Sequence, residues 1–353
     1  MKMIMDCSTS SSWTGPLVGI PRVEVELLHH LSQKCQVKPV VYDGSSSMWN
    51  WDAEDLIVSF GATWNYQGWL DVVETIKKNK MGRYVHLIHD LIPIKFPYLY
   101  EPRFDLNFAN WLCRTVKAAD LLLCPSESTR RDLCEFINEN NLNRVRIETI
   151  RLGDVGFSNP KDSIATAGLS GEKYFLMVGT LEQRKNHQVI FDAIRILEKR
   201  HLLADFYLVV VGREGWLPNN LTQQLKEDEI LKRRVRYFSN LNDLDMKRVV
   251  QEASFSVFPS IYEGWGLPVA ESLALGVPVI AANNSSLLEI APNLTTHVDS
   301  YNAMAWADAI AQWIQNPGVL NEKRNAVELT YIATPWERTA DRIYELMREV
   351  IRG

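Results

Sequence analysis

Residues 258–272 read FPSIYEGWGLPVAES, an apolar run followed by a glycine-rich loop and then by Pro268. Glu263 and Glu271 stand on either side of this proline. Proline is favoured in the first turn of a helix, where no N–H group is needed. The stretch therefore predicts a buried strand, a loop of close backbone approach and a helix, the repeating unit of an α/β fold.

The same alternation of short apolar runs and amphipathic helical patterns extends over the whole chain of 353 residues. This pattern is typical of parallel α/β units, and the length favours two domains. We expect helices at 21–32, 104–119, 187–200 and 243–252, and a polar linker at 156–172. The expected strands are 1–7, 38–42, 56–60, 84–89, 121–124 and 146–150 in the first half, and 174–179, 206–212, 235–238, 255–259, 277–281 and 296–298 in the second.

The composition narrows the class of protein. A formal net charge of −5 argues against broad nucleic-acid binding, which needs basic surface. The basic clusters at 77–83 and 232–234 favour solvated helix faces, with attraction to an anionic membrane as the alternative. No run approaches the ~18 apolar residues of a membrane span, and no signal peptide is recognisable. Five cysteines without CxxC spacing indicate reduced thiols, so we expect a cytoplasmic protein.

Two adjacent cations, Arg184 and Lys185, follow the expected strand 174–179 and precede the helix 187–200. Positive charge is unfavourable beside a helix N-terminus, so we expect an anion between these side chains and the helix. Arginine can bind a phosphate through two N–H donors, and lysine adds a compact charge. The pair therefore predicts a phosphate site at the carboxyl end of a strand, where α/β sheets bind ligands.

The opening stretch offers a matching set of groups. Gly264 and Gly266 permit close backbone approach, and the first turn after Pro268 offers unpaired N–H groups to phosphate oxygens. We expect Glu271 near the end of that turn and Glu263 in the loop. Backbone donors between two carboxylates suit a phosphate between two polyhydroxyl groups, which is the layout of a nucleotide sugar.

A metal site is the weaker interpretation of these acids. No histidine accompanies the two glutamates, and no acidic cluster completes a coordination shell. The tripeptide Asp243-Leu244-Asp245 has the DxD pattern of some manganese-binding transferases. It also begins the expected helix 243–252, so we interpret it as helix capping.

Two further stretches leave alternatives open. Residues 14–22, TGPLVGIPR, are a glycine loop before a helix, either an anion site or a structural turn. His89-Asp90 ends the expected strand 84–89, either as site residues or as a buried histidine and a helix cap. No GxSxG sequence accompanies them, which argues against a hydrolase triad.

Three spaced motifs together resemble the retaining GT-B glycosyltransferases of family GT4. They are Arg184-Lys185-Asn186, the segment EGWGLPVAE at 263–271, and TPWERTA at 334–340. The resemblance implies an α/β fold with two Rossmann-like domains that face each other across a cleft. It implies an acceptor-binding domain at 1–160, a donor-binding domain at 170–335, and a C-terminal helix, 336–353, that crosses back to the first domain.

The resemblance also implies roles for individual residues. Arg184 and Lys185 would hold the donor diphosphate and stabilise the leaving group, while Glu263 would accept hydrogen bonds from the donor hexose. His89 would reach the reaction centre, and Glu271 would bind the ribose hydroxyls. The other donor-binding positions implied by the resemblance are Gly19, Gly179, Gly212, Arg213, Leu241, Gly264, Trp265, Gly266 and Leu267.

The expected activity is transfer of a hexose from a nucleotide sugar to a lipid-linked or growing glycan of a bacterial surface polysaccharide. GDP-mannose is the favoured donor and dTDP-rhamnose the alternative. The resemblance implies no cofactor and no divalent metal, because Arg184 and Lys185 stabilise the diphosphate. The partners would be the donor and the glycan acceptor, with no nucleic acid and with possible peripheral contact at the inner face of the cytoplasmic membrane.

Other functions remain open at this point. A GT-B sugar-nucleotide epimerase would share the fold and motifs, and a non-catalytic glycan-binding subunit would share the fold. A nicotinamide-dependent dehydrogenase lacks support, because no GxGxxG sequence is present. Four tryptophans, Trp49, Trp51, Trp64 and Trp69, could stack on sugars, although core or surface packing is the more general explanation.

Overall fold

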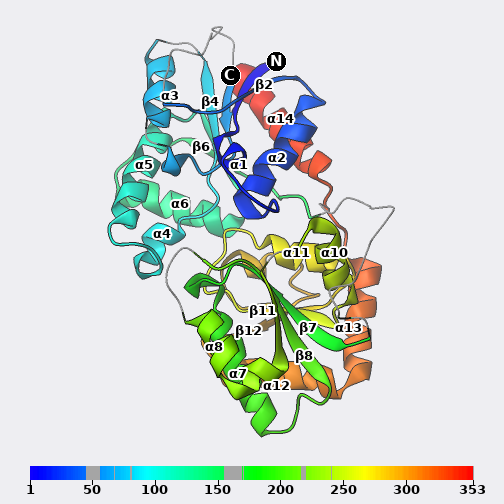
Figure 1. The fold of residues 1–353 in the computed structure, drawn as a ribbon. Coiled ribbons are helices and arrows are strands. Elements are labelled where there is room, and N and C mark those ends of the chain that lie inside the picture. The colour runs from blue at the N-terminus through cyan, green and yellow to red at the C-terminus, as the bar shows by residue number, and fades with distance from the viewer. Residues whose placement is uncertain are drawn as a thin grey trace. The chain divides into compact units, whose positions relative to one another are not determined.

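The computed structural model describes residues 1–44, 56–66, 68–79, 82–154, 169, 171–215, 220–239 and 241–352. The chain forms two units, each built on a six-stranded parallel sheet flanked by helices (Figure 1). The N-terminal unit comprises Met1–Gly153 with Thr334–Gly353, and the C-terminal unit comprises Asp154–Ala333.

The sheet of the N-terminal unit has the order β2-β1-β3-β4-β5-β6. Its strands are β1 (Lys2–Asp6), β2 (Gln36–Val40), β3 (Leu56–Ser59), β4 (Arg83–Leu87), β5 (Leu121–Cys124) and β6 (Arg146–Thr149). The chain leaves β1 first toward β2 and later toward β3, so the connections diverge between β1 and β3. Such a switch point is where parallel sheets bind ligands.

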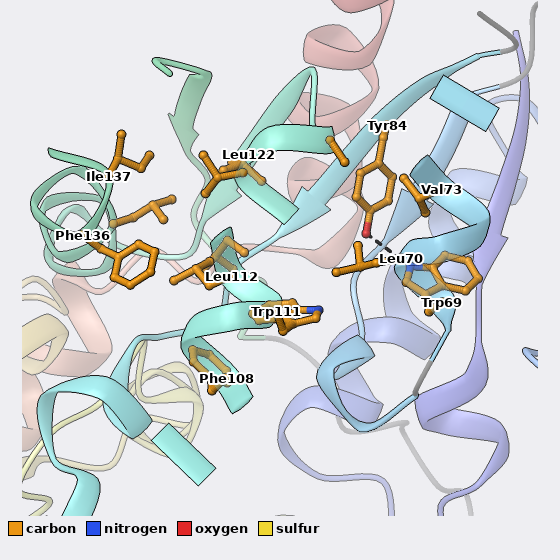
Figure 2. Packing of buried hydrophobic residues seen from close by; sticks show 14 of the residues in the cluster. Trp69, Leu70, Val73, Tyr84, Phe108, Trp111, Leu112, Leu122, Phe136 and Ile137 are labelled. Atoms are coloured by element: carbon orange, nitrogen blue, oxygen red, sulfur yellow. Dashed lines mark hydrogen bonds between the residues drawn. The ribbon is translucent and has the colours of Figure 1, made fainter. Parts of the chain in front are cut away.

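One face of this sheet packs against three helices, α3 (Trp69–Lys78), α5 (Phe104–Ala118) and α6 (Glu127–Glu139). Figure 2 shows the aromatic core between them, in which Trp69 Nε1 donates a hydrogen bond of 3.3 Å to Tyr84 Oη. Because Tyr84 Oη accepts this hydrogen bond, the indole N–H of Trp69 can be buried away from water. This core explains why Trp69 is fully buried.

Two helices distant in sequence lie side by side in this unit, α2 (Gly19–Ser32) and α14 (Trp336–Arg352) (Figure 1). Trp336, the first residue of α14, covers Gly153 so closely that a Cβ there would lie 2.5 Å from the indole ring. The C-terminal helix therefore belongs to the N-terminal unit. Shorter helices complete the unit: α1 (Ser8–Ser11), η1 (Thr63–Asn65), α4 (Ile92–Lys95) and η2 (Pro97–Leu99).

The sheet of the C-terminal unit has the order β12-β11-β10-β7-β8-β9, the strand order of a Rossmann fold. Its strands are β7 (Lys173–Val178), β8 (Phe206–Val211), β9 (Val235–Phe238), β10 (Phe255–Phe258), β11 (Val279–Ala282) and β12 (Thr296–Val298). The chain runs from β7 to β8 and β9, and then returns to the other side of β7 at β10. The switch point of this sheet therefore lies between β7 and β10.

Both faces of this sheet are buried, as expected for parallel strands. Tyr174 and Leu176 of β7 contribute to an apolar cluster with α10, while Phe175 stacks on Phe255 at 5.1 Å on the other face. Trp313 of α12 packs edge-on against Phe255. The helices are η3 (Gln183–Lys185), α7 (His187–Lys199), α8 (Leu221–Glu227), α9 (Glu229–Arg234), α10 (Asp243–Glu252), α11 (Leu267–Ala274), η4 (Ser285–Leu288), α12 (Ala303–Gln315) and α13 (Pro317–Thr330).

The expected strands and helices are confirmed, with three starts shifted by two residues. The helix expected at 21–32 begins at Gly19. The strand expected at 38–42 begins at Gln36, and it tolerates Pro39 because β2 is an edge strand. The strand expected at 277–281 begins at Val279, directly after Pro278, which has no N–H for the ladder. The expected linker at 156–172 lies outside the described residues except for 169, 171 and 172.

The tryptophans that could have stacked on sugars are core residues wherever the structure describes them. Trp64 is partly buried against Phe108 and Trp111, at ring distances of 5.3 and 5.2 Å, and Trp69 is fully buried. Trp49 and Trp51 lie outside the described residues. Across the parts of the chain that the structure describes, every helix is too short or too polar to cross a membrane.

Candidate functional site

The cations predicted from the sequence lie at the switch point of the C-terminal sheet. Arg184 and Lys185 form the end of η3, just after β7, and Asn186 joins η3 to α7. Asn186 has a left-handed backbone, with φ of 57°, which asparagine tolerates better than most residues. Its Nδ2 donates to the carbonyl oxygens of Pro259 at 3.1 Å and Ser300 at 2.7 Å. These bonds fix the cations beside the end of β10.

Glu263 binds both cations through its two carboxylate oxygens. Arg184 Nη1 donates to Oε2 at 2.8 Å, and Lys185 Nζ donates to Oε1 at 2.5 Å. Glu263 is 8% exposed, so these interactions are shielded from water. The structure thus brings together Arg184, Lys185 and Glu263, which are 79 positions apart at most.

The ionisation of Glu263 follows from this geometry. Burial alone would raise the pKa of the carboxyl group, but Arg184 and Lys185 outweigh it and lower the pKa to about 2. Glu263 is therefore a carboxylate at any physiological pH. It can position ligands or cations, and it does not act as a proton donor near neutrality.

A second carboxylate, which the sequence patterns did not single out, completes the group. Glu182 Oε1 accepts a hydrogen bond of 2.8 Å from Arg184 Nη2, so the guanidinium lies between Glu182 and Glu263. Two positive and two negative charges therefore meet here. The sequence predicted an external anion for Arg184 and Lys185, whereas the structure shows two internal ones. The available signal was the position of Glu182, two residues before Arg184 in the loop that follows β7.

The glycine-rich loop after β10 has the close approach that its sequence predicted. Gly266 has φ of 106°, and a Cβ there would lie 2.8 Å from Leu287 Cδ2, so only glycine fits without strain. Leu267 then begins α11, and Pro268 is its second residue. Glu271 is the fifth residue of α11, so it lies in the second turn and the expectation of a first-turn position is wrong.

Two serines hold the backbone of this loop. Ser286 Oγ donates to the carbonyl oxygens of Glu263 at 2.9 Å and Trp265 at 2.7 Å, and Glu263 N donates to Ser285 Oγ at 3.0 Å. Gly264 and Trp265 are buried within the loop. No residue pattern indicated these serines, because they lie beyond β11, more than twenty residues from Glu263. They fix the conformation from which Glu263 reaches the cations.

The other expected donor-binding residues follow neighbouring strands. A Cβ on Gly212 would lie 1.9 Å from the carbonyl oxygen of Gly179, so the carboxyl ends of β7 and β8 touch through glycine. The carbonyl oxygen of Arg213 accepts a hydrogen bond of 2.8 Å from Leu181 N. Leu241 is partly buried against the apolar cluster under α10. Their contact with a nucleotide stays a prediction.

Two expected site residues lie in the N-terminal unit. Gly19 is the first residue of α2, with a left-handed φ of 57°. His89 Nε2 bonds to the carbonyl oxygen of Phe60 at 2.7 Å, which assigns the ring proton to Nε2. Burial lowers the pKa of His89 to about 4, so the ring is neutral near pH 7. Asp90 Oδ1 accepts a hydrogen bond of 3.0 Å from Ile92 N at the start of α4, although the N-cap position itself is Leu91.

The DxD tripeptide begins α10, as predicted. The cap itself is Asn242, whose Oδ1 accepts hydrogen bonds from Leu244 N at 3.0 Å and Asp245 N at 2.9 Å. Asp243 and Asp245 lie in the first turn, where negative charge is favourable. The described part of the chain contains no group of three or more His, Cys, Asp or Glu side chains that could hold a metal ion.

The region that contains Arg184, Lys185 and Glu263 resembles known proteins. Residues 160–329 match the family model of the glycosyl transferases group 1. The serotype-specific mannosyltransferase WbdA of Escherichia coli is 26% identical over 240 residues, which cover 65% of this chain and 29% of the relative. The O-antigen chain mannosyltransferase B of Escherichia coli is 26% identical, with 67% of this chain and 63% of the relative covered. The chain thus matches less than two thirds of either relative.

Solved structures with this fold include the sucrose-phosphate synthase of Thermosynechococcus elongatus, with a TM-score of 0.74 and 16% identity over 100% of this chain and 99% of that one. HepE of Anabaena, solved with UDP-glucose, has a TM-score of 0.73 and 14% identity over 99% and 100% of the two chains. Residues 160–329 therefore match the group 1 glycosyl transferases, and the chain has a two-unit GT-B fold, as the motifs around Arg184 and Glu263 predicted.

Proposed function

We propose that this chain is a retaining glycosyltransferase that transfers a hexose, with mannose favoured, from a nucleotide sugar to a glycan acceptor. The observation that carries the proposal is the pair of cations, Arg184 and Lys185, which share the buried carboxylate of Glu263 at the switch point of a Rossmann-type sheet. A nucleoside diphosphate needs such preorganised positive charge, and this edge of the sheet is where it binds.

The proposed chemistry uses charge rather than proton transfer by a carboxyl group. Arg184 and Lys185 stabilise the negative charge that develops on the diphosphate as the glycosidic bond breaks. The acceptor hydroxyl attacks from the leaving-group face, and its proton passes to the departing phosphate oxygen, so the anomeric configuration is retained. Glu263, with its pKa near 2, accepts hydrogen bonds from the hexose and takes no proton. No divalent metal takes part.

The proposed donor is GDP-mannose, and the acceptor is a lipid-linked or growing glycan of a bacterial surface polysaccharide. The mannosyltransferase names of the relatives support this choice. dTDP-rhamnose is the alternative donor. We place the reaction in the cytoplasm, at the inner face of the membrane, where such acceptors are built.

The basic clusters contribute little to membrane contact in this proposal. Lys77 and Arg83 both pair with Asp120, and Arg233 and Arg234 both pair with Glu198. Because each carboxylate offsets part of the positive charge beside it, we assign any peripheral association chiefly to the acceptor lipid. Sedimentation with anionic vesicles, with and without acceptor, tests this assignment.

The experiment that tests the function begins with a thermal-shift screen of GDP-, dTDP- and UDP-sugars. A donor that binds the folded chain raises its melting temperature, and GDP-mannose should raise it most. The selected donor is then incubated with isolated lipid-linked glycans, and the anomeric proton of the product is assigned by NMR. An inverted product contradicts the mechanism. Conversion of the donor sugar without acceptor would instead identify an epimerase.

A further inference from the structure

The guanidinium of Arg184 is held from two sides by carboxylates with different surroundings. Glu263 lies on the loop after β10 and shares its charge with Lys185, whereas Glu182 accepts from Arg184 Nη2 alone among the contacts described for its side chain. The backbone around Glu182 is fixed by a bridge in which Leu181 N donates to the carbonyl oxygen of Arg213 at 2.8 Å. Glu182 is therefore a rigidly mounted partner of Arg184.

This arrangement leaves a buried polar atom without compensation. Glu182 is 8% exposed, and within the described residues its Oε2 has no hydrogen-bond partner. An unpaired carboxylate oxygen away from water destabilises a fold, so stability alone does not account for a glutamate at this position. Among the described residues, its one strong side-chain contact is the bond to Arg184. The question is then why Arg184 needs a second carboxylate when Glu263 already binds it.

The proposed function supplies the reason, and this inference rests on it. Glu263 has two tasks there, since it holds both cations in the free protein and accepts from the hexose hydroxyls when the donor is bound. A carboxylate that turns toward the sugar can no longer fix Arg184. We propose that Glu182 is the positioning residue that keeps the Arg184 guanidinium directed at the donor diphosphate while Glu263 engages the hexose.

Removing Glu182 should change the affinity for diphosphate in opposite directions if Glu182 positions Arg184 and if it acts only through its charge. A carboxylate beside a diphosphate site repels the ligand, so removing Glu182 would tighten diphosphate binding if charge were its only effect. If Glu182 positions Arg184, removing it frees the guanidinium and weakens binding. The two possibilities predict opposite changes in the same dissociation constant.

The experiment is a titration calorimetry series with GDP, UDP and dTDP on the full chain. We expect Glu182→Ala to weaken binding of the preferred diphosphate ~10-fold, the size typical of losing one charge-assisted hydrogen bond. Glu182→Gln should weaken diphosphate binding less, ~3-fold, because the amide oxygen of glutamine still accepts from Arg184 Nη2. In an Arg184→Ala background, Glu182→Ala should cause no further weakening, since its partner is gone.

A matched control is Glu198→Gln, because Glu198 also lies between two arginines, Arg233 and Arg234, but near the end of α7, about 16 Å along the helix from its start beside Arg184. It should leave diphosphate binding unchanged. Equal or tighter binding by both Glu182 variants overturns this inference alone. The inference is also overturned if Glu182→Ala weakens diphosphate binding equally in the native and the Arg184→Ala backgrounds. If Glu182→Ala does not fold, the sign given by Glu182→Gln decides. A native chain that binds none of the three diphosphates overturns the proposed function and this inference together.

Discussion

Glu263 joins Arg184 and Lys185 through separate oxygens, with Oε2 2.8 Å from Arg184 Nη1 and Oε1 2.5 Å from Lys185 Nζ. One carboxylate thus holds two adjacent cations beside the end of β10 and offsets their mutual repulsion. Removing any of the three takes away at least one ion-pair partner of a buried or partly buried charge, which destabilises the structure. The same three groups are preorganised for an incoming diphosphate and sugar.

The first prediction concerns these three side chains. Arg184→Ala, Lys185→Ala and Glu263→Ala should each reduce kcat/KM for sugar transfer at least ~100-fold, because each removes a fixed charge from the reacting diphosphate or sugar. The control is Lys173→Ala, whose ion pair with Asp205 lies on the surface and should contribute nothing to turnover. Steady-state kinetics with the selected donor measure all four. Near-normal rates in the three site variants would show that the active site lies elsewhere.

The second prediction concerns metal dependence. Because Arg184 and Lys185 supply the positive charge at the diphosphate, activity should change less than ~2-fold when EDTA is added, and manganese should restore nothing. The comparison uses the enzyme after dialysis against chelator, assayed with and without added Mn²⁺. Loss of activity in EDTA that is reversed by manganese would contradict the mechanism.

The third prediction concerns the contact between the ends of β7 and β8. Gly212→Ala should lower the free energy of unfolding by ~1–3 kcal/mol, since the added Cβ would lie 1.9 Å from the carbonyl oxygen of Gly179. The matched control is Gly318→Ala in α13, where a Cβ meets nothing within 4 Å. Alanine favours a helix, so the control should be neutral or stabilising by up to ~1 kcal/mol. Urea unfolding followed by tryptophan fluorescence compares the two. Equal stability of Gly212→Ala and the native chain would contradict the predicted steric clash.

Local sequence was sufficient for the parts of the fold that local pattern controls. Strand positions followed from apolar runs, and Arg184, Lys185 and Gly266 were identified because each stands directly after a strand or before a helix. The contacts that complete the site join segments far apart in the chain. Ser286 follows β11 in the chain and donates a hydrogen bond to the carbonyl oxygen of Glu263. No residue pattern near Ser286 or Glu263 indicates this bond.

The charge balance of the site was the other part that sequence could not supply. Two cations before a helix indicated that an anion lies beside them. That anion could be a bound ligand or a carboxylate of the protein, and the sequence does not distinguish the two. Only the structure shows that Glu263 and Glu182 occupy this position in the free chain. Trp69 illustrates the same limit. Local sequence does not distinguish a tryptophan that stacks on a sugar from one that packs in the core, and the structure shows Trp69 fully buried.

Two carboxyl groups in the N-terminal unit set up a prediction of pH dependence. Asp6 ends β1, and Glu24 of α2 lies against Gly61, where a Cβ would be only 2.2 Å from Glu24 Oε1. Both carboxyl groups are fully buried. Burial raises the pKa of Asp6 to about 6 and the pKa of Glu24 to about 7, although Ser8 and Ser10 donate hydrogen bonds to them.

The fourth prediction follows from the direction of these shifts. The folded pKa of Glu24 lies above its unfolded value of 4.5, so its protonated form stabilises the fold fully below pH 4.5, and this stability is lost as pH rises toward 7. Glu24→Gln imitates the protonated form and does not titrate. The variant should therefore gain stability relative to the native chain by up to about 3 kcal/mol between pH 4.5 and 8.

Urea midpoints of the two chains at matched pH values measure this difference. The buried histidines His86, His89 and His187, whose pKa values burial lowers, titrate in both chains and cancel from the comparison. Asp6 also remains in both, and without the charge of Glu24 beside it, it should ionise more easily in the variant. A constant difference in stability across this range would contradict the raised pKa of Glu24.

The fifth prediction separates the two features of Asn186, its left-handed backbone and its two side-chain hydrogen bonds. Asn186→Gly keeps the backbone conformation without strain but loses the bonds to the carbonyls of Pro259 and Ser300. Asn186→Ala loses the bonds and adds ~1–2 kcal/mol of left-handed strain. If the bonds fix the cations beside β10, stability should fall from the native chain to Asn186→Gly and again to Asn186→Ala. The loss of the bonds alone should amount to ~1–3 kcal/mol. Because η3 is then less firmly held, both variants should also weaken nucleoside diphosphate binding in calorimetry. A glycine variant with native stability and native binding would show that only the backbone conformation of Asn186 matters.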